Sequence, residues 1–270
     1  SGLGMPSFTL LGSGVIKRHY VQSYALGHEI VHSWIGNAVF NRGERGNWVE
    51  GLTTYLANYY WHELMGDRAQ ARDQRRLMVQ GYNLHVPPER DYPVAQFTQK
   101  RDEHDNAIGY QKAAMLFHLL RQEVGDETFW RAVKSLVAQY HGRHAEWCDL
   151  ERVFAAESRQ DLRWFFVQWA EEDGAPALLL SEATARPVAG SANTFQLETA
   201  VIQSNKPFRF PLQLRIRMEG DREQMLTVRV VDPVGAPVPE ALVYLGGCDP
   251  DDSACQPLRT DQQGLLRVSP

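Results

Sequence analysis

Long apolar runs, blocks of basic residues and cysteine-rich motifs are all missing from this sequence of 270 residues. No apolar stretch approaches the roughly 20 residues that a membrane-spanning helix needs, so the sequence predicts no transmembrane segment. The net charge is −5, and Lys and Arg are not gathered into a patch. Because phosphate binding needs clustered positive charge, we expect no nucleic-acid partner.

Cysteine is scarce, and the three cysteines fit no zinc-finger spacing. Cys248 and Cys255 flank an acidic loop, where they could form a disulfide or remain two free thiols. A disulfide would favour an oxidising compartment, so an extracytoplasmic or membrane-attached location is favoured over a cytoplasmic one, and the sequence leaves the compartment open. Cys148 sits among apolar positions of a predicted helix, and we expect it to be buried.

The pattern of apolar residues changes from helical to strand-like near residue 180. Helical spacing predicts helices at 24–35, 48–64, 67–79, 108–124, 145–157 and 161–171, with a further helix after Gly125. Alternating segments then predict strands at 195–202, 208–217, 226–231 and 242–245. We therefore expect an α+β protein, with a mainly helical domain over residues 1–182 and a small all-β, sandwich-like domain over residues 183–270.

The motif His28-Glu29-Ile30-Val31-His32 carries the clearest chemical signal. On a helix, residues four apart lie on the same face, so both imidazoles can bind one Zn²⁺ ion at about 2.0–2.1 Å. Glu29 follows the first histidine and lies beside the site rather than on the metal. That position suits a base that takes a proton from water.

A catalytic zinc site needs a third protein ligand and one open position. Glu50 opens the next predicted helix, and the loop that precedes it is long enough to reverse the chain direction. Glu44 is the alternative ligand, but it lies within that Gly- and Asn-rich loop, where its position is less fixed. We favour Glu50 and predict one Zn²⁺ per chain.

Other histidines fit structural roles better than metal binding. His141, His144 and Cys148 have a spacing that could in principle hold a metal, but we expect the two histidines on a surface turn. His118 lies within the predicted helix 108–124 and is expected to be packed or hydrogen-bonded rather than a ligand.

Three motifs together resemble those of the aminopeptidase-N-like zinc metallopeptidases. Residues 28–37, His-Glu-Ile-Val-His-Ser-Trp-Ile-Gly-Asn, are similar to the family's His-Glu-x-x-His-Gln-Trp-Phe-Gly-Asn. Residues 48–55, Trp-Val-Glu-Gly-Leu-Thr-Thr-Tyr, resemble Trp-x-Asn-Glu-Gly-Phe-x-x-Tyr with one residue fewer. Residues 109–113, Gly-Tyr-Gln-Lys-Ala, are similar to Tyr-Glu-Lys-Gly. The resemblance extends over about residues 1–175.

The resemblance implies a thermolysin-like catalytic domain of the gluzincin class, which hydrolyses peptide bonds with zinc. Glu29 would activate water, and Tyr110 would donate a hydrogen bond to the oxyanion that forms during hydrolysis. The substrate would be a peptide, and aminopeptidase action is the expected form. In this family the catalytic domain follows a β-domain, so the resemblance also implies a longer protein with an upstream β-domain and an N-terminally truncated catalytic domain here.

Departures from the family pattern bear on the substrate. Val49 stands where the family has Asn, and the strand expected as Gly-x-Met-Glu-Asn reads Gly-Leu-Gly-Met-Pro at residues 2–6, without a carboxylate to hold a free amine. Gly4 and Met5 are still expected to line the cleft as an edge strand. Two alternatives stay open: a zinc hydrolase acting on a substrate without a free amine, and a catalytically retired binding module on the same scaffold.

Overall fold

The computed structural model describes residues 2–17, 21–180, 184–187, 195–198, 201–217, 223–229, 242–245, 258–259 and 267–268. The chain divides into two compact units, Ser1–Gly174 and Ala175–Pro270. This division falls a few residues before the boundary at 182/183 that the sequence suggests. Cys248 and Cys255 lie outside the described residues.

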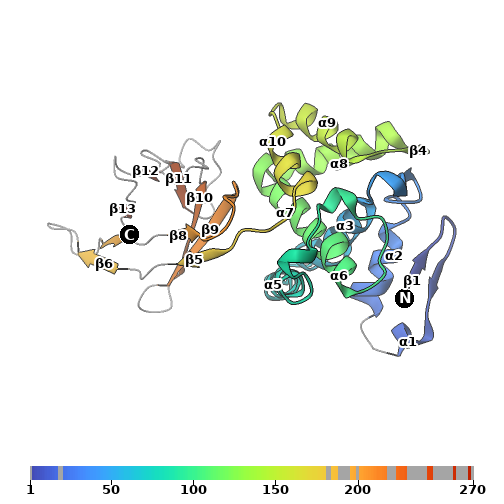
Figure 1. Cartoon of the computed structure of the whole chain (residues 1–270), viewed down its shortest axis with the longest axis horizontal. Coiled ribbons are helices and arrows are strands. Elements are labelled where there is room, and N and C mark those ends of the chain that lie inside the picture. The colour runs from blue at the N-terminus through green and yellow to red at the C-terminus, as the bar shows by residue number, and fades with distance from the viewer. Residues whose placement is uncertain are drawn as a thin grey trace. The chain divides into compact units, whose positions relative to one another are not determined.

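The first unit is mainly helical, as predicted, with small sheets at its edges (Figure 1). The π-helical segments η1, η3 and η6 lead into α-helices, and η7 follows α10 and ends in extended backbone. The segments η2, η4 and η5 are short 3₁₀ turns. In chain order the elements are β1 (Gly2–Gly4), β2 (Thr9–Leu11), α1 (Ser13–Ile16), η1 (Val21–Leu26), α2 (Gly27–Val31), β3 (Val39–Phe40), η2 (Gly43–Arg45), α3 (Val49–Thr54), η3 (Tyr55–Tyr60), α4 (Trp61–Leu64), α5 (Arg68–His85), η4 (Pro88–Arg90), η5 (Val94–Gln96), α6 (Glu103–Asn106), η6 (Ala107–Lys112), α7 (Ala113–Val124), α8 (Asp126–Tyr140), β4 (Arg143–His144), α9 (Trp147–Ser158), α10 (Arg163–Phe166) and η7 (Val167–Glu171).

Two predicted helices end elsewhere than the sequence suggests. The helix predicted at 24–35 ends as α2 at Val31, because the chain turns there and Gly36 adopts a positive φ of 112°. Helix α5 runs to His85 instead of ending at residue 79, and it continues through Gly81. Glycine is unfavourable inside a helix, so a close contact with a neighbouring element is expected at position 81.

Helix α7 forms the centre of the helical unit. Its buried residues recur at helical spacing, including Leu116, Phe117 and Leu120, each at most 1% exposed. Helices α3, α5 and α8 pack against it, and the π-helical segment η6 leads directly into it. Gly125, with a positive φ of 84°, ends α7 and precedes α8, as its position in the sequence predicts.

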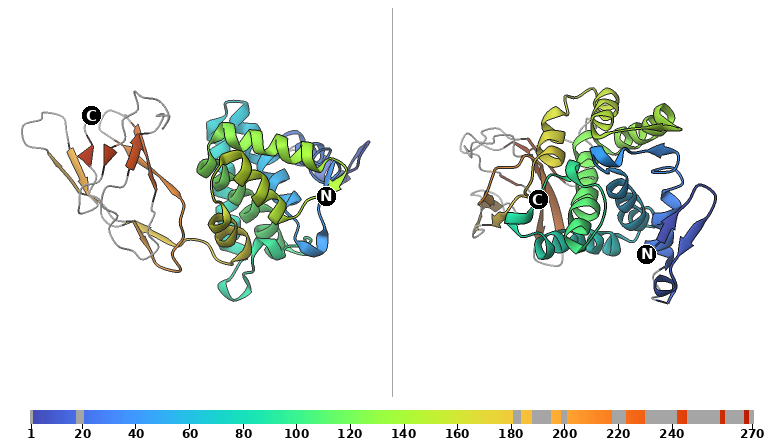
Figure 2. Two further views of the ribbon diagram at one scale, coloured as in Figure 1. Left: turned by 90° about the horizontal axis from the view of Figure 1, so that it is seen from above. Right: turned by 45° about the vertical axis from the view of Figure 1, so that its right-hand side comes forward.

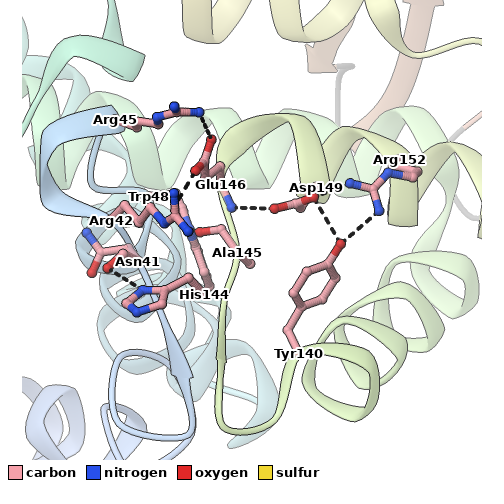
Figure 3. Close-up of polar contacts among 10 residues, drawn as sticks. All are labelled: Asn41, Arg42, Arg45, Trp48, Tyr140, His144, Ala145, Glu146, Asp149 and Arg152. Carbon is pink, nitrogen blue, oxygen red and sulfur yellow. Dashed lines mark hydrogen bonds and ion pairs between the residues drawn. The ribbon is translucent and has the colours of Figure 1, made fainter.

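The chain between α2 and α3 is attached to the segment that precedes α9 (Figure 3). Strand β3 pairs in parallel with β4, and the buried Trp48 Nε1 donates a hydrogen bond of 2.7 Å to Ala145 O. At the surface, Arg45 Nη1 donates to Glu146 Oε2 at 3.2 Å. These contacts fix the point at which α3 begins, and therefore the position of Glu50, the second residue of this helix.

The described residues of the second unit contain short strands: β5 (Leu178–Leu180), β6 (Thr184–Pro187), β7 (Phe195–Glu198), β8 (Val201–Gln203), β9 (Pro211–Arg217), β10 (Glu223–Arg229), β11 (Leu242–Leu245), β12 (Leu258–Arg259) and β13 (Arg267–Val268). They form an antiparallel sheet of order β12-β11-β10-β9, a sheet of order β13-β7-β6 and the pair β5-β8. Figure 2 shows the ribbon in two further views. The segment predicted as one strand at 195–202 is divided, because β7 and β8 pair in different sheets. The sandwich arrangement stays a prediction.

Within the described part of the chain, no helix is long and apolar enough to cross a membrane. The prediction that Cys148 is buried is wrong, because α9 turns Trp147 and Leu150 inward and leaves Cys148 exposed. His141 and His144 are exposed, as expected. His118 packs against two tyrosine rings, and Gln122 Nε2 lies 3.1 Å from its Nε2.

Replacing Trp48 tests the attachment of α3. Trp48→Phe keeps most of the apolar surface but leaves the buried Ala145 carbonyl without its donor, so we expect a loss of about 1–3 kcal/mol in the free energy of unfolding. Urea unfolding measures it. Trp61→Phe is the matched control, since Trp61 is 45% exposed and its replacement should change stability by less than about 0.5 kcal/mol. Equal effects of the two variants would contradict the proposed role of Trp48.

Candidate metal centre

Helices α2 and α3 bring three potential metal ligands together. Glu50 Oε2 lies 3.1 Å from His28 Nε2 and 3.5 Å from His32 Nε2. Two ligands that each lie 2.0–2.1 Å from a tetrahedral zinc ion are about 3.3 Å apart, so these separations fit a shared ion. The candidate ligand atoms of the three residues all lie within 4.8 Å of one another. Glu44, the alternative third ligand, is exposed in η2 and does not belong to this group.

The histidine rings are oriented by their backbone and by their neighbours. His32 N donates to His28 O at 3.2 Å, so one helical turn separates the two imidazoles, whose ring centroids are 4.7 Å apart. The Ile35 carbonyl oxygen lies 2.9 Å from His32 Nδ1. When Nδ1 donates its proton to this carbonyl, Nε2 keeps a free lone pair directed at the site, which is the arrangement that metal-binding histidines usually have.

The charge state of Glu50 suits a metal ligand. Burial acts to raise the pKa of Glu50, but hydrogen bonds to His28 and His32 and their positive charge outweigh burial and lower this pKa to about 2. Burial acts to lower the pKa of His32, whereas Glu50 raises it above its usual value. Glu50 is therefore ionised at neutral pH, as a metal-binding carboxylate must be.

Glu29, a residue of α2, is buried against strand β1, with 7% of its surface exposed. The backbone of β1 passes so close that a Cβ on Gly2 would lie 2.3 Å from Glu29 Oε1, and one on Gly4 would lie 2.7 Å from Glu29 O. Asn37 Nδ2 donates to Gly4 O at 3.0 Å and holds the strand there. Gly4 thus lies at the site, whereas Met5 follows the strand and is not among the lining residues of the cavity.

Tyr110 reaches the same site from η6. Its ring lies nearly parallel to that of His28, with 6.0 Å between the ring centroids. It also packs edge-on against the Phe97 ring, whose centroid is 5.8 Å away. Burial raises the pKa of Tyr110 far above its usual value, and the negative charge of Glu50 raises it further. The phenol therefore keeps its proton at neutral pH and can act as a hydrogen-bond donor.

A cavity of about 780 Å³ contains all of these groups: His28, Glu29, His32, Glu50 and Tyr110 line it together with Gly4. Sequence reasoning missed a second set of lining residues, which are polar and sit on helices: Thr54, Asn58, Gln74 and Gln111. One signal was available in the sequence. Thr54 and Asn58 are four residues apart on the face of the predicted helix 48–64 that faces inward, where apolar residues are usual.

Comparison with known families agrees with this geometry. Residues 15–169, more than half of the chain, match the family described as "Peptidase family M1 domain". The chain belongs to peptidase family M1. The resemblance to aminopeptidase-N-like zinc peptidases that the three motifs suggest is therefore confirmed.

Relatives within the M1 family are distant and longer. Aminopeptidase 2, mitochondrial, of Saccharomyces cerevisiae is 25% identical over 166 residues, which cover 57% of this chain and 17% of that protein. Aminopeptidase O of Homo sapiens is 22% identical over 230 residues, which cover 73% of this chain and 28% of that protein, so the chain spans less than a third of the length of either relative.

Two solved structures of peptidases show the same fold. An M1 zinc metallopeptidase mutant from Deinococcus radiodurans, bound to a Tyr-Ser-Ala substrate, gives a TM-score of 0.50 at 24% identity, covering 66% of this chain and 38% of that one. Legionella pneumophila aminopeptidase A gives a TM-score of 0.50 at 21% identity, covering 89% of this chain and 24% of that one.

Gly51, directly after Glu50, lets α3 approach α7 closely, because a Cβ at this position would lie 2.4 Å from the Ala113 Cβ. We expect Gly51→Ala to displace Glu50 from the histidines and to weaken zinc binding about 10- to 100-fold, as loss of supporting contacts typically does. Competition with a chelating dye measures the affinity.

The compensating change Ala113→Gly removes the clashing methyl group, so the double variant should recover part of the loss. Gly43→Ala is the control, since a Cβ at Gly43 would meet nothing within 4 Å. If Gly51→Ala binds zinc as tightly as the parent protein, close packing of α3 on α7 does not position the ligand.

Proposed function

We propose that this M1 domain is a zinc-dependent peptidase, of the aminopeptidase type, in which His28, His32 and Glu50 hold the metal. One observation carries the proposal. The three ligand atoms converge at separations that fit a single zinc ion, inside a cavity that Glu29 and Tyr110 also line. A retired binding module would need neither a buried general base nor a phenol beside the ligands.

A bound zinc ion would polarise the scissile carbonyl and make water more acidic. Glu29 is the residue next to this position that can accept a proton from the attacking water and return it to the departing amine. Tyr110 is placed to donate a hydrogen bond to the carbonyl oxygen as it gains negative charge. The backbone of β1, which lies against Glu29, offers the edge of a strand along which a peptide can lie.

A second candidate differs in the substrate rather than in the metal chemistry. Among the described residues that line the cavity, the acidic ones are Glu29 and Glu50. The proposal assigns both of them to the metal centre. No further lining carboxylate is thus left in this part of the chain to bind a free amine. This favours, as the alternative, a zinc hydrolase whose substrate has no free amino terminus.

Kinetics of peptide hydrolysis test the assignment. We expect activity that a chelator abolishes and zinc restores. Tyr110→Phe should lower kcat about 100- to 1,000-fold with little change in KM, because its hydrogen bond forms mainly in the transition state. Tyr140→Phe is the matched control: it also removes a hydrogen-bonded phenol, but on α8, where it contacts Asp149, and it should leave kcat unchanged.

Comparison of free and N-blocked peptides separates the two candidates. Cleavage restricted to free amino termini would support aminopeptidase action, and equal cleavage of both would support the alternative. A chain that binds zinc but hydrolyses neither would overturn the proposed function.

A further inference from the structure

Tyr110 lies on η6, a π-helical segment of six residues, rather than on an ordinary α-helix. A π-helical turn holds more residues than an α-helical one, so it changes the directions of the side chains along it. The direction of the phenol therefore depends on how this short segment is held in place.

Two consecutive residues of a neighbouring loop contact both ends of η6. Asp91 and Tyr92 lie in the chain between η4 and η5. Tyr92 OH donates to Asp105 Oδ1 at 2.7 Å, on α6 just before η6 begins. At the other end, Lys112, the last residue of η6, donates from Nζ to Asp91 Oδ2 at 3.4 Å. The loop therefore holds the segment on both sides of Tyr110.

The contact between Lys112 and Asp91 is a buried ion pair whose carboxylate has several further partners. The two side chains are only 7% and 6% exposed. Tyr82 OH and Gly174 N also donate to Asp91 Oδ2, each at 2.5 Å. The Lys112 ammonium lies over the Tyr82 ring, 5.0 Å from its centroid. Apolar residues in place of a buried ion pair often stabilise a fold equally well, so stability alone does not account for this pair.

The ion pair lies on the side of η6 that faces away from the cavity. Residues two apart on a helix are separated by about half a turn, so Lys112 and Tyr110 point to nearly opposite sides. Tyr110 lines the cavity, and Lys112 is not among the described residues that do. A rotation of η6 that moved Lys112 away from Asp91 would therefore also move the phenol away from the ring of His28, on which it stacks.

We propose that Asp91, Tyr92 and Lys112 are positioning residues of the peptidase reaction, which hold η6 in the orientation that presents the Tyr110 phenol to the substrate carbonyl. This inference rests on the proposed function. The three residues act without touching the substrate, because a displacement of about 1 Å at a catalytic group can lower a rate about 100-fold. The proposed zinc ligands come from α2 and α3, so the loss of these contacts should leave zinc binding intact.

Lys112→Met tests the ion pair, because it keeps the length of the side chain and removes its charge. We expect kcat to fall at least about tenfold, with KM and zinc content close to those of the parent protein. A general loss of structure would lower the zinc content as well. Lys134→Met is the matched control: Lys134 is exposed on α8, and its replacement should leave kcat unchanged.

Combination with Tyr110→Phe separates positioning of the phenol from other effects. If Lys112 acts through the phenol, Lys112→Met should lower kcat by less than about twofold once the hydroxyl is gone. A decrease by the same factor with and without the hydroxyl would overturn the proposal, because Lys112 would then act independently of Tyr110.

Two further variants avoid the unpaired buried carboxylate that Lys112→Met creates. Asp91→Asn combined with Lys112→Met removes both charges and keeps an oxygen that can accept from Tyr82. Tyr92→Phe removes only the hydroxyl that binds Asp105. Both should bind zinc as the parent does and should have a lower kcat. A kcat equal to the parent's in either variant would overturn the role of the contact that it removes.

Crystal structures of the zinc-loaded parent and of the double variant give a readout that does not need turnover. We expect the Tyr110 ring of the variant to lie about 1 Å or more from its place in the parent, with His28, His32 and Glu50 still together. A parent protein that hydrolyses no peptide would overturn the proposed function. An unmoved Tyr110 in the variant would overturn the positioning role, whatever the activity of the parent.

Discussion

The contact between the Glu50 carboxylate and the two imidazoles of α2 is the interaction on which the site depends. His28 and His32 follow from a single helical turn, and local geometry alone places them on one face. Glu50 comes from a different helix, and only tertiary packing brings it to 3.1 and 3.5 Å from the two Nε2 atoms. The histidines lower the pKa of Glu50, so its carboxylate is ionised at neutral pH and could serve as a negatively charged ligand of a cation.

Much of the helical unit can be understood as support for this contact. The Trp48 indole fixes the start of α3, the missing Cβ of Gly51 lets α3 approach α7, and η6 then carries Tyr110 to the same cavity. Each of these features acts through close packing of buried groups, so the addition or removal of a single methyl group can displace a helix. Glycine recurs where an element must approach another closely: Gly2 and Gly4 against Glu29, Gly51 against Ala113 and Gly81 against Gln111.

The sequence predicted the parts of the site that short-range rules govern. The spacing of His28 and His32 predicts a shared face, and the position of Glu50 at the start of a second helix favours it over Glu44 as a third ligand. The structure places Glu50 beside the two histidines. Helix positions followed from apolar spacing, because burial against α7 produces that spacing. The exposure of Cys148 was not predictable in this way, since the helical phase of α9 relative to the core depends on tertiary packing.

Other features could not be predicted from the sequence because they depend on contacts between separate secondary-structure elements. The continuation of α5 through Gly81 makes sense only once Gln111 is seen against its backbone. The π-helical segments, which change the register of side chains along η3 and η6, leave no trace in apolar spacing. The polar lining residues Thr54, Asn58 and Gln111 come from helical segments that are far apart in the sequence, so no linear motif reveals that they line one cavity.

Metal analysis of the purified protein and of two glutamate variants tests the central claim most directly. The account predicts about one zinc ion per chain in the parent protein and in Glu44→Ala, whose side chain is exposed in η2, and a large loss of zinc in Glu50→Ala. Full retention of zinc in Glu50→Ala, or its loss in Glu44→Ala alone, would contradict the convergence of His28, His32 and Glu50 on one ion.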